Sequence, residues 1–296
     1  MRGQIIDAIF AEMEHNDDIY FLTADMGINL VEKFGEKFPD RYANVGIAEQ
    51  NLIGVGAGLA NLGYRPFAYT ISNFVIHRCL EQIRNDIGIH RYPITLLGTS
   101  TGFDNAPLGP THHIIDEWGS LQSLPEIDIY CPSSVTYAST LVQTVLSEAR
   151  PAYIRIPKGE HREPDSKEHM VHLAGNRGGT ALISYGNPLQ ACLQARDTNP
   201  ELGVIAINRL RPLPDAVLKD ALSQYGTAIV VEDHFPNSGL YGSLCEFVNR
   251  HQIPIRLFPL APTDYTFDVG TSPEYFSKKF GLDADGVLNK VAEISK

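Results

Sequence analysis

Short apolar runs alternate with longer amphipathic segments through the first half of the chain. The apolar runs are rich in β-branched and aromatic residues and are bounded by Gly or Pro, which is typical of buried strands. We predict strands at residues 19–25, 65–72, 93–100, 127–131 and 152–156. We predict helices between them at residues 49–62, 74–90, 114–124 and 134–149, the last with Ser134 as its N-cap. This alternation predicts a parallel sheet that is covered by helices on both faces.

The pattern stops at residues 158–178, which are polar, hold no sustained periodicity and end in glycines. Strand-like runs then return at residues 179–186, 203–210, 228–234 and 253–260, and helical runs lie between them, from about residue 188 and at 214–224 and 239–250. We therefore predict a first domain at residues 1–160, a linker at 161–177 and a second, smaller domain at 178–296. The predicted fold class is α/β, with two tandem open, mostly parallel sheets and helices on both faces.

Composition narrows the function classes. Of the 296 residues, 43% are hydrophobic and 20% are charged, which is typical of a globular protein. The net charge of −11 and the absence of basic runs longer than two residues argue against a nucleic-acid partner. Neither a run of ~18 apolar residues nor an N-terminal apolar signal segment is present, so we expect no membrane partner and a cytoplasmic protein. The four cysteines are scattered, which favours reduced thiols over a disulfide framework or a zinc site.

The segments that follow the predicted strands carry the candidate chemistry, because ligands of open α/β sheets bind beyond the carboxyl ends of the strands. In the first domain these segments are residues 24–30, 72–75 and 99–116. Phe74 lies just past one strand end. It is either a core aromatic residue or a ring that stacks on a flat heterocycle at this edge.

Glu49 lies in the stretch 44–51, which leads into a helix of very small residues. A carboxylate at a helix start is commonly only a favourable partner of the helix dipole. However, Ile47, Ala48 and Leu52 give Glu49 an apolar setting. A carboxyl group in such a setting can hold a proton or exchange it with a ligand nitrogen.

The glycines that follow Glu49 do not form a dinucleotide-binding motif, because position 59 is Leu and no strand immediately precedes them. Gly54, Ala57, Gly58 and Asn61 instead share one helix face. We interpret this face as a surface for close helix packing, for which a subunit interface is one candidate.

Residues 109–113, with the sequence Gly-Pro-Thr-His-His, end a long irregular loop. Loops of this length inside compact α/β domains are usually functional or disordered. The paired histidines are a weak metal signal, because adjacent side chains diverge and no carboxylate or cysteine has ligand spacing, so we predict no metal ligand in this chain. His112 or His113 is either a structural histidine or a substrate contact that hydrogen-bonds an oxyanion or an alcohol.

Three motifs in order make the chain resemble the transketolase family. NVGIAEQN resembles the family's G-x-x-E segment, RPFAYTISNFVIHRCLEQIRNDI resembles its strand–aromatic–helix segment, and GPTHHIIDEWGSLQSLPEIDIYCPS resembles its G-P-T-H loop. Residues 1–160 thus resemble the family's pyrimidine domain. Residues 178–296 resemble its C-terminal domain, including AINRLRPLP and VVEDHFPNSGLYGS.

The resemblance implies one half of a split enzyme. Such enzymes also carry a domain that binds magnesium and the diphosphate through a G-D-G motif, and this chain contains no G-D-G. It resembles split transketolases and the β-chains of pyruvate-dehydrogenase-type enzymes, in which that domain is a separate polypeptide. The resemblance therefore implies thiamine diphosphate and Mg²⁺ as cofactors, with the Mg²⁺ ligands on the partner chain. It also implies a diphosphate-binding subunit as partner, and homodimerisation within an α2β2 assembly.

The resemblance also implies roles for individual residues. Glu49 would protonate the aminopyrimidine ring and so promote removal of the thiazolium proton, while His112 would contact an oxygen of the substrate. Phe74 would stack on the pyrimidine, Ile47 would support the bent cofactor, and Asp25 would lie close to it.

The substrate positions depart from the family pattern. Asn29, Thr99 and Lys158 fall where Ser, His and Arg usually hold a sugar phosphate, and Ala-Pro-Leu precedes the G-P-T-H motif where the family carries G-E-D. Loss of the His and exchange of Arg for Lys weaken bidentate phosphate recognition. We therefore expect a sugar that differs from the standard pentose phosphates, such as a modified or unphosphorylated one. His77 also replaces an expected aromatic residue.

The main prediction is a subunit of a two-chain, thiamine-diphosphate-dependent transketolase. It would transfer a two-carbon ketol unit between sugars and act only with its partner. Two alternatives stay open, namely a subunit that uses a 2-oxo acid donor, as in deoxyxylulose-phosphate synthases, and a non-catalytic scaffold that has kept the fold. Release of carbon dioxide from pyruvate would identify the first, and unchanged activity after replacement of Glu49 would identify the second.

Overall fold

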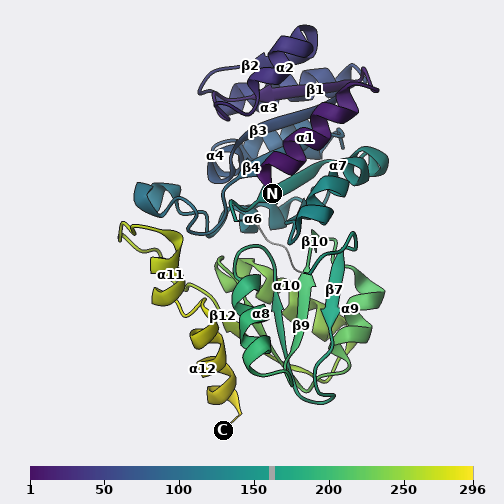
Figure 1. Cartoon of the computed structure of the whole chain (residues 1–296). Coiled ribbons are helices and arrows are strands. Elements are labelled where there is room, and N and C mark those ends of the chain that lie inside the picture. Colours follow the sequence, from purple (N-terminus) through teal and green to yellow (C-terminus); the bar gives the residue numbers. More distant parts are fainter. Residues whose placement is uncertain (160–163, 296) are drawn as a thin grey trace.

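The computed structural model describes residues 1–159 and 164–295. It contains two α/β units that lie end to end, with the N-terminal half in purple to teal and the C-terminal half in green to yellow (Figure 1). Each unit is built on one twisted sheet. The predicted fold class, two open and mostly parallel sheets with helices on both faces, is confirmed.

The first sheet has the strand order β10-β5-β6-β4-β3-β1-β2. Its strands are β1 (Ile19–Thr23), β2 (Tyr42–Asn44), β3 (Arg65–Ile71), β4 (Thr95–Thr99), β5 (Asp128–Tyr130), β6 (Ala152–Ile156) and β10 (Arg209–Arg211). All neighbours pair in parallel except β10, which runs antiparallel to β5 with Arg209 opposite Tyr130. Because β10 comes from the second half of the chain, the two units share a sheet edge.

Alternate strand residues of the first sheet face two different helix layers, as the strand period of two requires. One layer contains α1 (Arg2–Met13), α2 (Glu32–Lys37) and α7 (Val135–Glu148), which pack on Phe21, Phe67 and their neighbours. The other contains α3 (Glu49–Asn61), α4 (Ser72–His77) and α6 (Glu117–Ser120), which pack on Leu22, Ala68 and their neighbours. The short elements between them are the 3₁₀ turns η1 (Pro39–Arg41), η3 (Ala106–Leu108), η4 (Pro110–His112) and η5 (Leu121–Ser123), the helix α5 (Leu80–Gln82) and the π-helix η2 (Ile83–Gly88).

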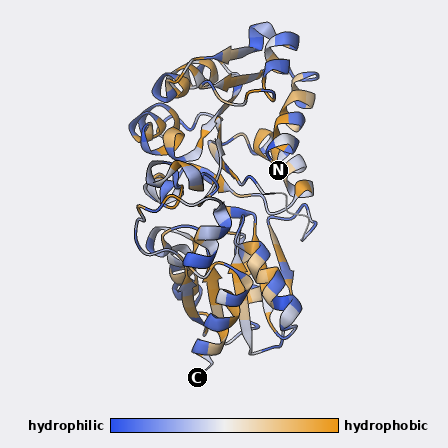
Figure 2. Ribbon diagram, turned by 60° about the vertical axis from the view of Figure 1, so that its left-hand side comes forward, coloured by the Kyte–Doolittle hydropathy of each residue, from blue (hydrophilic) through white to orange (hydrophobic). Residues whose placement is uncertain are grey.

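The second sheet has the strand order β12-β11-β8-β9-β7, parallel except for β7. Its strands are β7 (Met170–Leu173), β8 (Thr180–Ser184), β9 (Gly203–Ile207), β11 (Thr227–Val231) and β12 (Arg256–Leu260). The helices are α8 (Leu189–Thr198) and α12 (Ala284–Ile294) on one face, α9 (Asp215–Leu222) and α10 (Leu240–His251) on the other, with η6 (Pro236–Ser238) and α11 (Pro273–Lys279) in the connections. Figure 2 shows the apolar residues concentrated on the strands and on the inner helix faces.

The two units share a continuous core. One hydrophobic cluster joins Trp118 and Leu121 of the first unit to Tyr185 and Leu240 of the second. A buried ion pair network crosses the same junction, because Arg155 on β6 contacts Glu117 Oε1 at 2.5 Å and Asp233 Oδ1 at 2.8 Å. The site is therefore attached to a rigid two-unit frame rather than to one isolated domain.

Several local predictions were wrong. The sequence pattern missed α1, α2, β2, α11 and α12. The predicted helix 74–90 is broken at Arg78 and Cys79 into α4, α5 and a π-helical turn, and the predicted helix 114–124 holds only the four residues of α6 and the turn η5. The predicted linker includes β7, which pairs with β9, although its residues 161–163 lie outside the described residues.

The four cysteines all lie in the described residues and form no disulfide, as expected, and all but Cys245 are buried. Burial raises the pKa of the Cys192 thiol to about 12, which favours the protonated thiol. Across residues 1–159 and 164–295, no helix is long and apolar enough to cross a lipid bilayer.

Candidate functional site

The candidate residues gather at the carboxyl edge of the adjacent strands β4, β3, β1 and β2. The backbone at this edge is unusual, because Asp25, Asn29 and Ser100 all have positive φ angles, at 53°, 62° and 71°. Such conformations are costly for residues other than Gly and concentrate at functional sites. The edge of the sheet that the sequence indicated thus also carries local backbone strain.

Glu49 is the first residue of α3, and its side chain is only 2% exposed. The helix start favours its negative charge, and Ile53 and Leu52 of the same helix are buried around it. One carboxylate oxygen, Oε2, accepts a hydrogen bond from Arg78 Nη1 at 2.5 Å. The apolar setting predicted for Glu49 is therefore incomplete, because a guanidinium group reaches it from α4.

Phe74 lies in the first turn of α4, directly beyond the end of β3. Its ring meets the His112 ring edge to face, with centroids 5.2 Å apart. Asn73 Nδ2 donates to the Thr111 carbonyl at 2.8 Å, and the Thr111 hydroxyl lies 3.0 Å from His112 Nδ1. These contacts hold the Gly-Pro-Thr-His turn against α4, so that Phe74 and His112 form one unit.

Arg78 joins these groups and was missed by the sequence analysis. Its guanidinium carbon lies 4.9 Å from the centroid of the Phe74 ring, while Nη1 contacts Glu49. A signal was present, because residues four apart on a helix lie on one face and Arg78 follows Phe74 by four. The structure therefore brings Glu49, Arg78, Phe74 and His112 into one continuous set of contacts.

Asp25 and Ile47 flank this set at the ends of β1 and β2. Asn44 links them, because its Oδ1 accepts from the backbone N–H groups of Asp25 and Gly46, both at 3.0 Å, and its Nδ2 donates to Asp25 Oδ1 at 3.1 Å. Ile47 is 78% exposed, an unusual position for a branched apolar side chain. Asn29 lies in the same loop region, where its N–H donates to Glu32 Oε1 at 2.8 Å.

The predicted phosphate contacts are only partly brought together. Lys158 follows β6, and its Nζ lies 2.6 Å from Asn105 Oδ1, next to Ser100. Asn105 Nδ2 is buried and has no hydrogen-bond partner in the described part of the chain. Thr99, by contrast, is buried beside Tyr69 at 1% exposure, so its side chain does not lie at the open edge.

The two adjacent histidines diverge. His112 contacts Phe74, whereas His113 is buried between Phe103 and Phe276, with ring centroids at 5.2 and 4.7 Å. Burial lowers the pKa of His113, which fits a neutral ring in an aromatic cluster between the two units. This placement favours the structural interpretation for His113 and leaves His112 as the candidate for substrate contact.

The loop after β12 reaches the site from the second unit. The Tyr265 hydroxyl donates a hydrogen bond to Asp116 Oδ2, and His77 Nε2 lies 3.1 Å from Asp116 Oδ1. The hydrogen bond to Asp116 raises the pKa of His77. Although burial opposes it, contact with His77 and Tyr265 holds the pKa of Asp116 below its usual range. His77, which stands where an aromatic ring was expected, thus anchors this loop.

No metal cluster is present at this edge. Within residues 1–159 and 164–295, no group of three His, Cys, Asp or Glu side chains is arranged to hold a metal ion. The acidic residues Asp264, Asp268 and Glu274, which we interpreted as solvated, lie in the loop after β12 and at the start of α11, and Asp268 pairs with Lys279.

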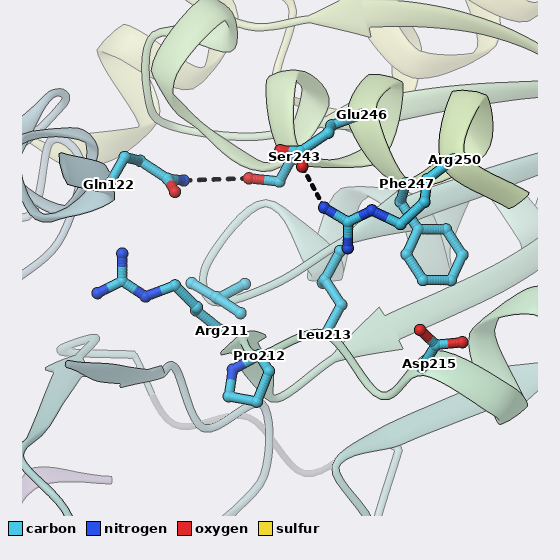
Figure 3. Close-up of a pocket in the computed structure, with 10 residues that line it drawn as sticks. Gln122, Arg211, Pro212, Leu213, Asp215, Ser243, Glu246, Phe247 and Arg250 are labelled. Carbon is cyan, nitrogen blue, oxygen red and sulfur yellow. Dashed lines mark hydrogen bonds and ion pairs between the residues drawn. The ribbon is translucent and has the colours of Figure 1, made fainter. Parts of the chain in front are cut away.

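A separate cavity of about 340 Å³ lies where the two units meet (Figure 3). Its polar groups are paired with one another or with the backbone. Gln122 Nε2 donates to Ser243 Oγ at 3.0 Å, Arg250 pairs with Glu246, and Arg211 donates to the carbonyls of Leu121 and Ile127. We therefore assign the candidate site to the edge around Glu49 and not to this cavity.

The fold and the site define a chain with a pyrimidine-binding type of domain followed by a smaller α/β domain. Residues 1–164 match the family model described as "Transketolase, pyrimidine binding domain", and residues 176–287 match "Transketolase, C-terminal domain". The chain belongs to the transketolase family. The resemblance noted from the motifs is thereby confirmed.

Among its relatives, the second of two named subunits of an apulose-4-phosphate transketolase from Actinobacillus succinogenes is 26% identical over 96% of this chain and 95% of its own length. The protein of the same name from Phocaeicola vulgatus is 26% identical over 100% of this chain and 97% of its own. A 1-deoxy-D-xylulose-5-phosphate synthase from Aquifex aeolicus is 27% identical over 96% of this chain but over only 46% of its own length.

Solved structures agree with this assignment. A protein described as a split gene transketolase in an inactive beta4 tetramer superimposes with a TM-score of 0.87 at 25% identity, covering 99% of this chain and 97% of that one. A transketolase mutant from Pichia stipitis superimposes with a TM-score of 0.76 at 16% identity, over 94% of this chain and 43% of that one, which shows the shared fold. The chain thus has the domain content of one subunit of a split transketolase.

Proposed function

We propose that this chain is the pyrimidine-binding subunit of a two-chain transketolase that uses thiamine diphosphate and Mg²⁺. It would transfer a two-carbon ketol unit between sugars once a diphosphate-binding partner chain is bound. The observation that carries the proposal is the contact set at the carboxyl edge of the sheet, where a buried carboxylate and an aromatic face are bridged by one planar group. Membership of the transketolase family supports the cofactor assignment.

The residues at the edge fit the aminopyrimidine half of thiamine diphosphate. A planar guanidinium already lies against both Glu49 and Phe74, so a flat heterocycle with a ring nitrogen can make the same two contacts. Glu49 would hydrogen-bond and protonate the ring nitrogen, and Phe74 would stack on the ring. Ile47 and Asp25, at the ends of the neighbouring strands, would support the cofactor from the other side. When bound, the cofactor supplies the nucleophilic carbon and the electron sink for carbon–carbon bond cleavage.

His112 is the proposed substrate contact. Its ring packs on Phe74, and the hydrogen bond between Asn73 and Thr111 holds its turn in place. A neutral imidazole in this position would donate to, or accept from, a substrate oxygen as the bond to the ketol unit forms or breaks. The chain's own contribution is thus to orient the cofactor ring, to hold a proton at Glu49 and to polarise the substrate through His112.

The partner would bring the diphosphate and Mg²⁺ ligands, in an α2β2 assembly in the cytoplasm. The two apulose-4-phosphate transketolase relatives, which are single subunits by name and whose whole length this chain matches, support a separate partner chain. The outer face of α3 supports close contact with another subunit, because an added Cβ at Gly54 or Gly58 would meet no atom within 4 Å. Ile47 and Val55 beside it are exposed, and exposed apolar residues grouped on one face are typical of protein interfaces.

Cofactor binding tests the split-enzyme proposal. We expect no thiamine diphosphate binding by calorimetry with this chain alone and saturable, Mg²⁺-dependent binding by the complex with a diphosphate-domain subunit. The physical reason is that this chain offers only the pyrimidine contacts, whereas the diphosphate carries most of the charge to be neutralised. Tight binding by the chain alone, or none by the complex, would contradict the proposal.

The substrate is proposed to differ from the standard pentose phosphates. Lys158 presents a single ammonium group and is held by Asn105, and Thr99 is withdrawn from the edge, so a phosphate would lose the bidentate contact that Arg provides. We expect the complex to use xylulose and ribose 5-phosphates at least ~10-fold less efficiently than its best modified or unphosphorylated sugar. A coupled assay of donors and acceptors measures this. Equal efficiency with the two pentose phosphates would refute it, and carbon dioxide release from pyruvate would favour the 2-oxo acid alternative.

A further inference from the structure

Arg78 contacts both side chains that the proposed function assigns to the aminopyrimidine ring. Its Nη1 donates to Glu49 Oε2 at 2.5 Å, and its guanidinium carbon lies 4.9 Å from the centroid of the Phe74 ring. Glu49 is 2% exposed, whereas Arg78 is 47% exposed and reaches the carboxylate from the solvent side. The carboxylate is therefore covered by a side chain that is itself free to move into water.

The guanidinium group resembles the ligand that Glu49 and Phe74 would bind. It is planar, it donates N–H hydrogen bonds in its plane, and it stacks on aromatic faces. An aminopyrimidine ring is also planar, offers nitrogen-bound hydrogens in its plane and stacks on aromatic rings. The same carboxylate oxygen and the same ring cannot satisfy both groups in this geometry, because each would need the space beside Phe74 and in front of Glu49.

The chemistry of Glu49 leads to the same conclusion. A carboxylate that accepts a hydrogen bond from a guanidinium is an acceptor at that oxygen, whereas the proposed role requires a carboxyl group that shares its proton with a ring nitrogen. A guanidinium beside it stabilises the ionised form and opposes that role. Arg78 must therefore move away from Glu49 before Glu49 can carry the proton.

The backbone permits this movement without any change of fold. Arg78 is the C-terminal cap of α4, where helix α4 ends and before α5 begins, and its own carbonyl is fixed by Gln50 Nε2 at 3.2 Å. Its side chain is attached at a helix end and is half exposed, so rotation about its side-chain bonds is enough to release Glu49.

We propose that Arg78 is an internal competitor of the aminopyrimidine ring, which it excludes while paired with Glu49 and stacked on Phe74, and that it thereby sets the affinity for the cofactor. This inference rests on the proposed function. A site that is open for only part of the time binds its ligand more weakly in proportion to that fraction. The contacts of Arg78, a partly exposed ion pair and an exposed cation–π contact, together predict a reduction in affinity of about 3- to 30-fold.

The test is calorimetric titration of thiamine diphosphate, in the presence of Mg²⁺, into the complex of this chain with its diphosphate-domain subunit. We expect Arg78→Ala to bind about 3- to 30-fold more tightly than the unchanged complex. Arg78→Lys keeps the charge but loses the planar fork, so its gain should be smaller. Arg84→Ala is the matched control, because it removes the same charge from the next turns, where Arg84 pairs with Asn85, and it should bind like the unchanged complex.

The outcomes separate this proposal from the proposed function. Unchanged or weaker binding by Arg78→Ala, with normal binding by the unchanged complex, would overturn the competition and leave the cofactor assignment standing. Absence of binding by the unchanged complex and all variants would overturn the cofactor assignment and the competition with it. A gain in affinity cannot result from a damaged fold, so the expected result would support a direct role of Arg78.

Discussion

Replacement of Glu49 with glutamine is expected to lower the ketol-transfer rate of the assembled complex by about 10²–10⁴-fold. Glutamine keeps the shape and the hydrogen-bonding capacity of the side chain but cannot hold and release a proton. Its effect should therefore fall mainly on kcat and much less on assembly. The measurement is the steady-state rate of the complex with a saturating donor and acceptor, together with its size by light scattering.

The fold should tolerate this change, which makes the result interpretable. Glu49 caps no turn through its side chain, and its partner Arg78 is half exposed, so the guanidinium can be hydrated when the carboxylate is gone. Glu81→Gln is a suitable control, because Glu81 lies on α5, close in sequence to Arg78, and is exposed. Full activity of Glu49→Gln would identify the chain as a scaffold that has kept the fold.

The sequence predicted the sheet strands well because buried parallel strands are locally recognisable. Their apolar runs are bounded by Gly and Pro, and each of the five predicted strands of the first domain contains an observed strand, from β1 to β6. Ser134 is an N-cap, as predicted, since its hydroxyl accepts from the Tyr137 N–H at 3.1 Å. Such signals depend on residues a few positions apart, so one sequence is enough to read them.

The elements that were missed depend on contacts between distant residues. Strand β10 is Arg209–Arg211, whose polar residues form a strand because their backbone pairs with β5. The helix predicted at 74–90 has apolar positions that are compatible with one continuous helix, but α4 has to end at Arg78 so that its residues reach the site. A π-helical turn follows, and such turns are frequent near functional sites.

The candidate site was predictable to the level of the sheet edge but not of the side chains. The end of each strand indicated where Glu49, Phe74 and the Gly-Pro-Thr-His turn would converge, and the structure brings them together. Periodicity could not decide between His112 and His113, because only the packing of Phe276 from the second unit separates their environments. The role of each residue in catalysis stays a prediction for the variants proposed above.

Replacement of Arg155 with methionine is expected to destabilise the chain by about 3–5 kcal/mol. Arg155 lies in β6, where every residue is buried, and its guanidinium contacts Glu117, Asp233 and the Ile114 carbonyl. Although burial opposes it, the two carboxylates hold the pKa of Arg155 well above its usual value, so the side chain stays charged. Methionine fills a similar volume but leaves two carboxylates buried without a cation.

Chemical denaturation, followed by the free energy of unfolding, measures this effect. Arg150→Met is the matched control, because Arg150 also pairs with a buried carboxylate, that of Asp128, but is 45% exposed, and Asp128 keeps its contact with Arg209. We expect that control to cost no more than about 1 kcal/mol. A combined variant with Glu117→Gln and Asp233→Asn should recover part of the loss in Arg155→Met, since it removes the unpaired charges. A loss below about 1 kcal/mol for Arg155→Met alone would show that water reaches these carboxylates and that the junction between the two units, which carries the loop bearing Tyr265 to the site, is held by its apolar core instead.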